Sequence, residues 1–197
     1  GNREVRVESL NVSSIVKGIA KTFVEMTKSR NITFLSKIPE QVMWNSDKGF
    51  LNTIIINLIS NAFKYTPDGQ SIKIEVDTSR ENMLALRVAN EGSTIKEKDF
   101  QYIFNRYAIL DNFENQDEKN FSRNGLGLAI SYNMAKLLNG TLKVENTPDG
   151  WVMFTLTLPV VKLTTGVSET KRLTAEYIPK IDTQSILKLP QYEFDKM

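Results

Sequence analysis

Two asparagines and a lysine stand at helical spacing in the stretch 57–67, which continues a largely apolar segment that begins at residue 50. Apolar residues recur there every three or four positions, which predicts a helix with an inward apolar face. Asn57, Asn61 and Lys64 form a second stripe on that helix. Carboxamide oxygens can ligate a hard cation such as Mg²⁺, and a lysine can meet the phosphates that the cation bridges. The pattern suits a magnesium nucleotide, although asparagines without such context are more often solvated positions on a surface helix.

A second motif favours the nucleotide interpretation. Residues 124–130 place Gly125 and Gly127 on either side of Leu126 at the mouth of an apolar helix. Free backbone amides and the helix dipole attract phosphate at such a place. A glycine pair by itself is equally typical of an ordinary turn from a loop into a helix.

Together, in this order, the two motifs resemble the nucleotide-binding domain of sensor histidine kinases, in the superfamily shared with gyrase, the Hsp90 chaperones and MutL. The resemblance extends over about residues 4–160. It implies that Asn57 coordinates magnesium, that Asn61 and Lys64 contact the phosphates of ATP, and that Tyr65 lies near the nucleotide.

Residues 90–94 (NEGST) occupy the place where this family has Asp-x-Gly-x-Gly after a strand. The resemblance implies that Asn90, Gly92 and Thr94 border the base. Asn90 can accept a hydrogen bond from the adenine amino group through its oxygen, without the charge of an aspartate. Without the family, Asn-Glu-Gly would be a plain turn.

Residues 100–107 resemble the aromatic box of the family. The resemblance implies that Phe104 and Tyr107 anchor the start of a lid over the nucleotide, and that Arg106 reaches the terminal phosphate. Without the family, two aromatic residues three apart more often mark the core face of a helix, and the arginine would be solvated. A polar stretch as long as 108–124 is uncommon in a compact domain unless it is functional or disordered, so we expect it to be the lid.

The elements that must position these motifs predict an α/β sandwich. The resemblance implies an α+β fold of the Bergerat type, a two-layer sandwich with a mixed, mostly antiparallel sheet and helices on one face. We expect residues 1–160 to form this catalytic domain, with the lid at about 108–124, and residues 161–197 to form an extension or linker. The expected helices cover 13–29, a motif helix from about 47 capped by Ser46, and 126–138; the expected strands cover 32–35, 72–76, 84–88, 141–145 and 151–158.

Composition argues against several classes of protein. With 41% hydrophobic residues in 197, the chain can bury a sizeable core. A net charge of +2 without a basic patch argues against nucleic-acid binding. The lack of cysteine excludes disulfides and thiolate metal sites, which fits the cytosol. No apolar run approaches the about 20 residues of a membrane span, so we expect no direct membrane contact by this fragment.

The chain contains no histidine, whereas the kinases that it resembles phosphorylate a histidine on a helical dimerisation domain. The resemblance therefore implies a monomeric catalytic fragment. The opening Gly1 and Asn2 are typical of what remains after removal of a tag. Its implied partners are the histidine-bearing dimerisation domain of the same parent protein and a response regulator or receiver domain downstream. The parent would be a hybrid two-component receptor of the inner membrane, with this domain in the cytoplasm.

Asn57 stands where the relatives of gyrase and Hsp90 carry a glutamate that activates water. The resemblance thus implies slow hydrolysis, with ATP and Mg²⁺ serving phosphoryl transfer to a histidine that is itself the nucleophile. Magnesium, Lys64 and Arg106 would neutralise charge on the transferring group.

Three departures from the family pattern leave a different class open. Asn90 replaces an aspartate, Thr94 replaces a glycine, and Arg123 stands where a further glycine is common. The alternative is a degenerate module that binds nucleotide weakly or not at all and acts through protein interaction. A serine kinase of the same superfamily is a further alternative.

Overall fold

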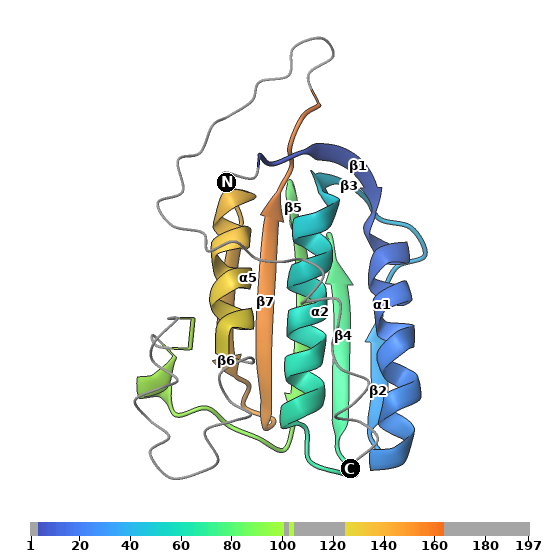
Figure 1. The fold of residues 1–197 in the computed structure, drawn as a ribbon, viewed down its shortest axis with the longest axis vertical. Coiled ribbons are helices and arrows are strands. Elements are labelled where there is room, and N and C mark those ends of the chain that lie inside the picture. The colour runs from blue at the N-terminus through green and yellow to red at the C-terminus, as the bar shows by residue number, and fades with distance from the viewer. Residues whose placement is uncertain (1–3, 101–102, 105–124, 164–197) are drawn as a thin grey trace.

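Three helices cover one face of a five-stranded sheet in the computed structural model, which describes residues 4–100, 103–104 and 125–163 (Figure 1). The sheet has the strand order β2-β4-β5-β7-β6, and only β2 and β4 are parallel neighbours. The α+β sandwich with a mixed, mostly antiparallel sheet is therefore confirmed. The strands are β2 (Thr33–Lys37), β4 (Ser71–Asp77), β5 (Met83–Glu91), β6 (Thr141–Asn146) and β7 (Trp151–Pro159).

The helices lie side by side on the sheet, with α2 between α5 and α1 (Figure 1). Their bounds are α1 (Val12–Thr27), α2 (Lys48–Tyr65) and α5 (Gly125–Leu137), and two short 3-10 turns are η1 (Lys28–Arg30) and η2 (Glu97–Asp99). Alternate residues of β4, β5 and β7 point into this helical layer and are buried there. The core consists mainly of isoleucine, leucine and valine, so burial of apolar surface holds the two layers together.

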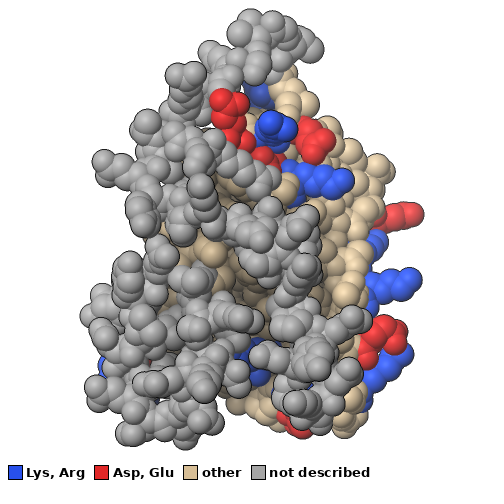
Figure 2. Space-filling view, viewed as in Figure 1, with Lys and Arg blue, Asp and Glu red and all other residues tan. Residues whose placement is uncertain are grey.

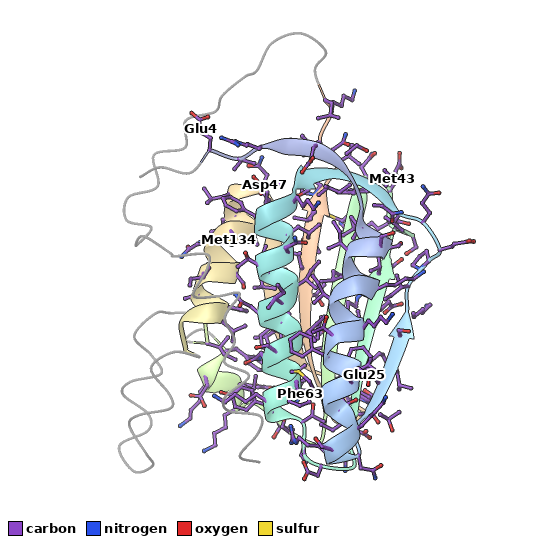
Figure 3. The ribbon with its side chains drawn as sticks, turned by 45° about the vertical axis from the view of Figure 1, so that its right-hand side comes forward. Glu4, Glu25, Met43, Asp47, Phe63 and Met134 are labelled. Carbon is purple, nitrogen blue, oxygen red and sulfur yellow. The ribbon has the colours of Figure 1, made fainter. Side chains whose placement is uncertain are left out.

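A two-stranded ribbon that the sequence did not predict lies at one end of the sandwich. Strand β1 (Val7–Asn11) pairs antiparallel with β3 (Met43–Asp47). The ribbon delivers Asp47 to the start of α2, where its carboxylate accepts hydrogen bonds from the amides of Phe50 (2.9 Å) and Arg6 (2.8 Å) (Figure 3). The prediction that Ser46 caps α2 was wrong, because Ser46 belongs to β3 and the next residue satisfies the first turn.

The described surface carries charges of both signs. Lysine and arginine are interspersed with aspartate and glutamate along the right-hand edge of the view in Figure 2. Among the helices of residues 4–100 and 125–163, none is long and apolar enough to cross a bilayer. The predicted lid (108–124), Arg106, Tyr107, Arg123 and residues 164–197 of the predicted extension lie outside the described residues.

Candidate nucleotide-binding site

Asn57 lies in the middle of α2, where this helix faces α5. Its Nδ2 donates one hydrogen bond to the carbonyl oxygen of Gly127 (3.1 Å) and another to the Oγ of Ser131 (3.0 Å). A carbonyl oxygen can only accept, so the nitrogen of the carboxamide must be the atom that faces α5. No hydrogen-bond donor among the described residues contacts Oδ1. The oxygen is therefore available to a ligand.

Gly127 leaves one side of this carboxamide uncovered. A Cβ at Gly127 would lie 3.4 Å from Cγ, 3.5 Å from Oδ1 and 3.6 Å from Nδ2 of Asn57. The glycine is thus in direct contact with the amide, in addition to its place in the first turn of α5 beside Gly125 and Leu126. The fold thus brings together the asparagine motif on α2 and the glycine motif at the start of α5.

The donor set fits a magnesium ion that arrives with a nucleotide. Asn57 supplies one neutral oxygen, and the described residues contain no cluster of three or more His, Cys, Asp or Glu side chains able to hold a metal. Mg²⁺ typically takes one or two protein ligands and completes its octahedron with substrate phosphates and water. A resident metal bound by protein side chains alone would need more ligands than this site offers.

The last two turns of α2 carry the other predicted phosphate-side residues. Asn61 is partly exposed and Lys64 is exposed. The Nζ of Lys64 lies 5.4 Å from the ring centroid of Tyr65, a residue that is 47% exposed. Partial burial raises the pKa of the Tyr65 hydroxyl above its ordinary value, so this hydroxyl is protonated at neutral pH and can donate a hydrogen bond.

Arg30 fixes the end of α2 from outside that helix. Its guanidinium donates to the carbonyl oxygens of Phe63 (2.7 Å) and Thr66 (2.5 Å) and pairs with Asp68 (2.7 Å). Figure 3 shows Phe63 at the far end of α2 from Asp47. Cations near a helix carboxyl end satisfy its free carbonyls and its dipole. Arg30 follows α1 in sequence, but it caps α2.

The turn after β5 packs against the turn after α2. Asn90 is only 2% exposed and donates from Nδ2 to the Oγ of Ser93 (2.6 Å). Gly92 has a φ of +82°, and a Cβ there would approach side-chain carbons of Gln70 (3.1 Å) and Pro67 (3.2 Å). Only glycine combines this backbone with this close approach. Gly92, one of the predicted base residues, therefore lies against the segment that follows Tyr65.

A side chain that the sequence did not indicate holds the next part of the chain. The carboxamide of Asn146, at the end of β6, accepts from the amide of Ile95 (3.1 Å) and donates to the carbonyl of Ile95 (2.6 Å). Both backbone groups of Ile95 are thereby satisfied by one residue. Thr94 next to it is exposed, and no contact of Thr94 with the other predicted residues is found in the described part of the chain.

Phe104 is held between α5 and β7. Its ring stacks on Tyr132, with centroids 5.1 Å apart and planes at 16°, and meets Phe154 edge-on at 6.2 Å. The Nζ of Lys136 lies 4.2 Å from the centroid of Tyr132 on its ring face. This packing gives Phe104 a fixed position next to the helix that begins with the glycine motif. Its role as a lid anchor stays a prediction.

Known proteins match the chain over this whole region. Residues 46–162 match the model of the family described as histidine kinase-, DNA gyrase B-, and HSP90-like ATPase. The sensor histidine kinase TmoS of Ectopseudomonas mendocina is 31% identical over 150 residues, which are 76% of this chain and 15% of that protein. The chain thus spans a small part of the length of such relatives.

Solved structures with the same fold are similar over most of the chain. The catalytic domain of the histidine kinase ThkA superposes with a TM-score of 0.67 at 23% identity, covering 79% of this chain and 98% of that one. A structure of ThkA in complex with the response regulator protein TrrA aligns with a TM-score of 0.65 at 22% identity, covering 80% of this chain and 42% of that one.

Proposed function

This chain belongs to the histidine kinase-, DNA gyrase B-, and HSP90-like ATPase family, and we propose that it is the ATP-binding catalytic domain of a sensor histidine kinase. In this proposal it positions magnesium ATP for phosphoryl transfer to a histidine on a separate dimerisation domain. The observation that carries the proposal is the carboxamide of Asn57, whose nitrogen is bound to α5 and whose oxygen is open. The relatives named as sensor histidine kinases support the choice of reaction.

The phosphate side of the site would be built on α2 and the first turn of α5. Asn57 would hold the magnesium ion, which neutralises phosphate charge when it is bound. Asn61 and Lys64 would bind phosphate oxygens, and the backbone amides of residues 125–127 at the start of α5 would add donors aligned with the helix dipole. Arg106 would reach the terminal phosphate. These groups position and neutralise, which is what phosphoryl transfer chiefly requires of a protein.

The identity of residue 57 decides between transfer and hydrolysis. An amide cannot take a proton from water, so Asn57 cannot serve as a general base. A histidine nucleophile needs no such base, because its neutral imidazole attacks directly. We therefore expect slow hydrolysis by this domain alone.

The base side of the site would be formed by the turn after β5. Asn90 would accept from the adenine amino group, with Gly92, Thr94 and Tyr65 around the base. Phe104 and Tyr107 would anchor a lid formed by residues 108–124, within a catalytic domain of residues 1–160 that is followed by an extension from 161. The close packing of Gly92 against Pro67 brings the turn after β5 next to the end of α2, which supports a base side adjacent to the phosphate side.

The partners follow from the proposed reaction. They are the histidine-bearing dimerisation domain of the same parent protein and a response regulator or receiver domain. The complex of ThkA with a response regulator supports the second partner. We place the domain on the cytoplasmic side of a membrane receptor, in keeping with the sensor kinases among its relatives.

Calorimetric titration with a non-hydrolysable ATP analogue, with and without magnesium, tests the proposal. The native chain should bind the magnesium complex, and Asn57→Ala should lose at least about tenfold in affinity when magnesium is present and much less when it is absent. Asn52→Ala is the matched control, because Asn52 is a part-buried amide on the same helix whose side chain makes no hydrogen bond to the described residues of α5. A folded native chain that binds no nucleotide would favour the degenerate interaction module.

A further inference from the structure

Ser131 is a fully buried hydroxyl whose recorded side-chain partner is 74 residues away. It lies on α5, its exposed fraction is 0%, and its Oγ accepts from Asn57 at 3.0 Å. A buried polar side chain is unfavourable unless it is hydrogen-bonded, and an alanine would fill this helical position without that requirement. The hydrogen bond to Asn57 on α2 accounts for a hydroxyl at this buried position.

The carboxamide of Asn57 could in principle adopt two orientations related by a half turn. The two orientations exchange a donor nitrogen for an acceptor oxygen of nearly the same size. Gly127 and Ser131 are one helical turn apart on α5, and each takes one hydrogen of Nδ2. The half turn would set Oδ1 against the carbonyl oxygen of Gly127, where two acceptors repel and that hydrogen bond is lost; the Ser131 hydroxyl could still donate to Oδ1, because a hydroxyl both donates and accepts. The carbonyl of Gly127 thus selects the orientation, and Ser131 adds a second hydrogen bond that holds the amide in it.

We propose that Ser131 is a positioning residue that, with the carbonyl of Gly127, orients the Asn57 carboxamide so that its oxygen faces the cation of a magnesium nucleotide. This inference rests on the proposed function, in which Asn57 is the magnesium ligand. Ser131 itself does not touch the ion, because its hydroxyl is buried and faces the nitrogen of the amide. Without Ser131, one hydrogen of Nδ2 loses its partner and the amide is held by a single contact.

The test compares Ser131→Ala with Ser13→Ala. Ser13 is also fully buried on a helix, but its Oγ has no hydrogen-bond partner among the described residues, so its removal leaves the hydrogen bonds of Asn57 in place. In Ser131→Ala, the hydrogen exchange of the Asn57 side-chain amide, measured by NMR, should accelerate about tenfold, as expected for loss of one hydrogen bond. Magnesium-dependent affinity for the ATP analogue should fall by about the same factor, while binding without magnesium should change little.

Ser131→Thr keeps the hydroxyl, so it should retain most of the protection of the Asn57 amide and most of the magnesium-dependent affinity. It also tests the inference if the alanine variant folds poorly. Equal exchange of the Asn57 amide in Ser131→Ala and Ser13→Ala would overturn the positioning role. If the amide is protected but the native chain binds no magnesium nucleotide, the proposed function fails, and with it the link to the cation. If nucleotide binds and magnesium dependence is unchanged in Ser131→Ala, the inference alone fails.

Discussion

Replacing Gly127 with alanine should stabilise the fold and weaken magnesium nucleotide binding, two effects of opposite sign. Gly127 is the third residue of α5, and a glycine within a helix costs about 0.5–1 kcal/mol relative to alanine. The new Cβ would lie 3.4–3.6 Å from the amide atoms of Asn57, which is ordinary contact, so no clash cancels the gain. For a domain of this size the gain corresponds to an increase in Tm of about 1–4 °C.

The same methyl group covers the carboxamide that would bind the cation. Mg²⁺ lies about 2.1 Å from each of its octahedral ligands, so neighbouring ligands lie about 3 Å from the oxygen of Asn57. A Cβ at Gly127 would stand 3.5 Å from that oxygen and compete for the space of a water or phosphate oxygen on this side. We expect an affinity loss of about tenfold, which is about 1.4 kcal/mol.

Differential scanning calorimetry and calorimetric titration with a magnesium ATP analogue measure the two effects. Gly18→Ala is the control, because Gly18 lies within α1 and a Cβ there would meet no atom of the rest of the described structure within 4 Å. It should gain a similar increase in Tm and keep native affinity. Gly127→Ala with native affinity would refute the assignment of Asn57 to the cation, and a decrease in Tm would refute the steric reasoning.

Three further perturbations test other parts of the structure. Arg30→Met should lower the free energy of unfolding by about 2–3 kcal/mol in urea titrations, because two carbonyls at the end of α2 lose a charged donor. Asn90→Asp should tighten binding of an ATP analogue and weaken binding of a GTP analogue in competition experiments; an unchanged ratio would contradict the predicted base contact. The pKa of Asp77 is lowered from 3.8 to about 2, chiefly by the backbone amide of Ser79 and also by Arg87. The stability that the Asp77 carboxylate contributes to the fold is fully present above the pKa of the unfolded state and is lost as the pH falls towards about 2. Asp77→Asn should therefore lose less stability than the native chain between about pH 5 and about pH 2 in thermal unfolding.

Most of the fold was predictable because apolar residues recur at regular spacing along its helices and strands. Strands β4 and β7 alternate buried and less buried residues along much of their length, every second residue of β5 from Leu84 to Asn90 is buried, and α2 shows apolar residues at helical spacing. The β1–β3 ribbon was not predictable, since each strand has only five residues and lacks a clean alternation. It forms through pairing between segments that are far apart in the chain, and the cap of α2 by Asp47 depends on it.

The residues of the site likewise fall into those that the sequence predicted and those that it missed. Asn57, Gly92 and Phe104 were singled out by residue type and motif, and the structure places each in a specific contact. Ser131 and Asn146 were missed because each acts on a partner 74 or 51 residues away, and a lone serine or asparagine carries no local pattern. Such partners are visible only once the chain is folded.

The two asparagines of the site differ in how their amides are oriented. At Asn57 the nitrogen faces the carbonyl of Gly127, a group that can only accept, so the oxygen points away from that carbonyl, as the proposed cation contact requires. At Asn90 the recorded partner is the hydroxyl of Ser93, which can either accept or donate. Asn90 can thus present its oxygen to the amino group of adenine or its nitrogen to the carbonyl of a 6-oxopurine. A carboxylate would accept only. The site should therefore discriminate less between ATP and GTP than its Asn90→Asp variant, while the selectivity for a cation at Asn57 stays intact.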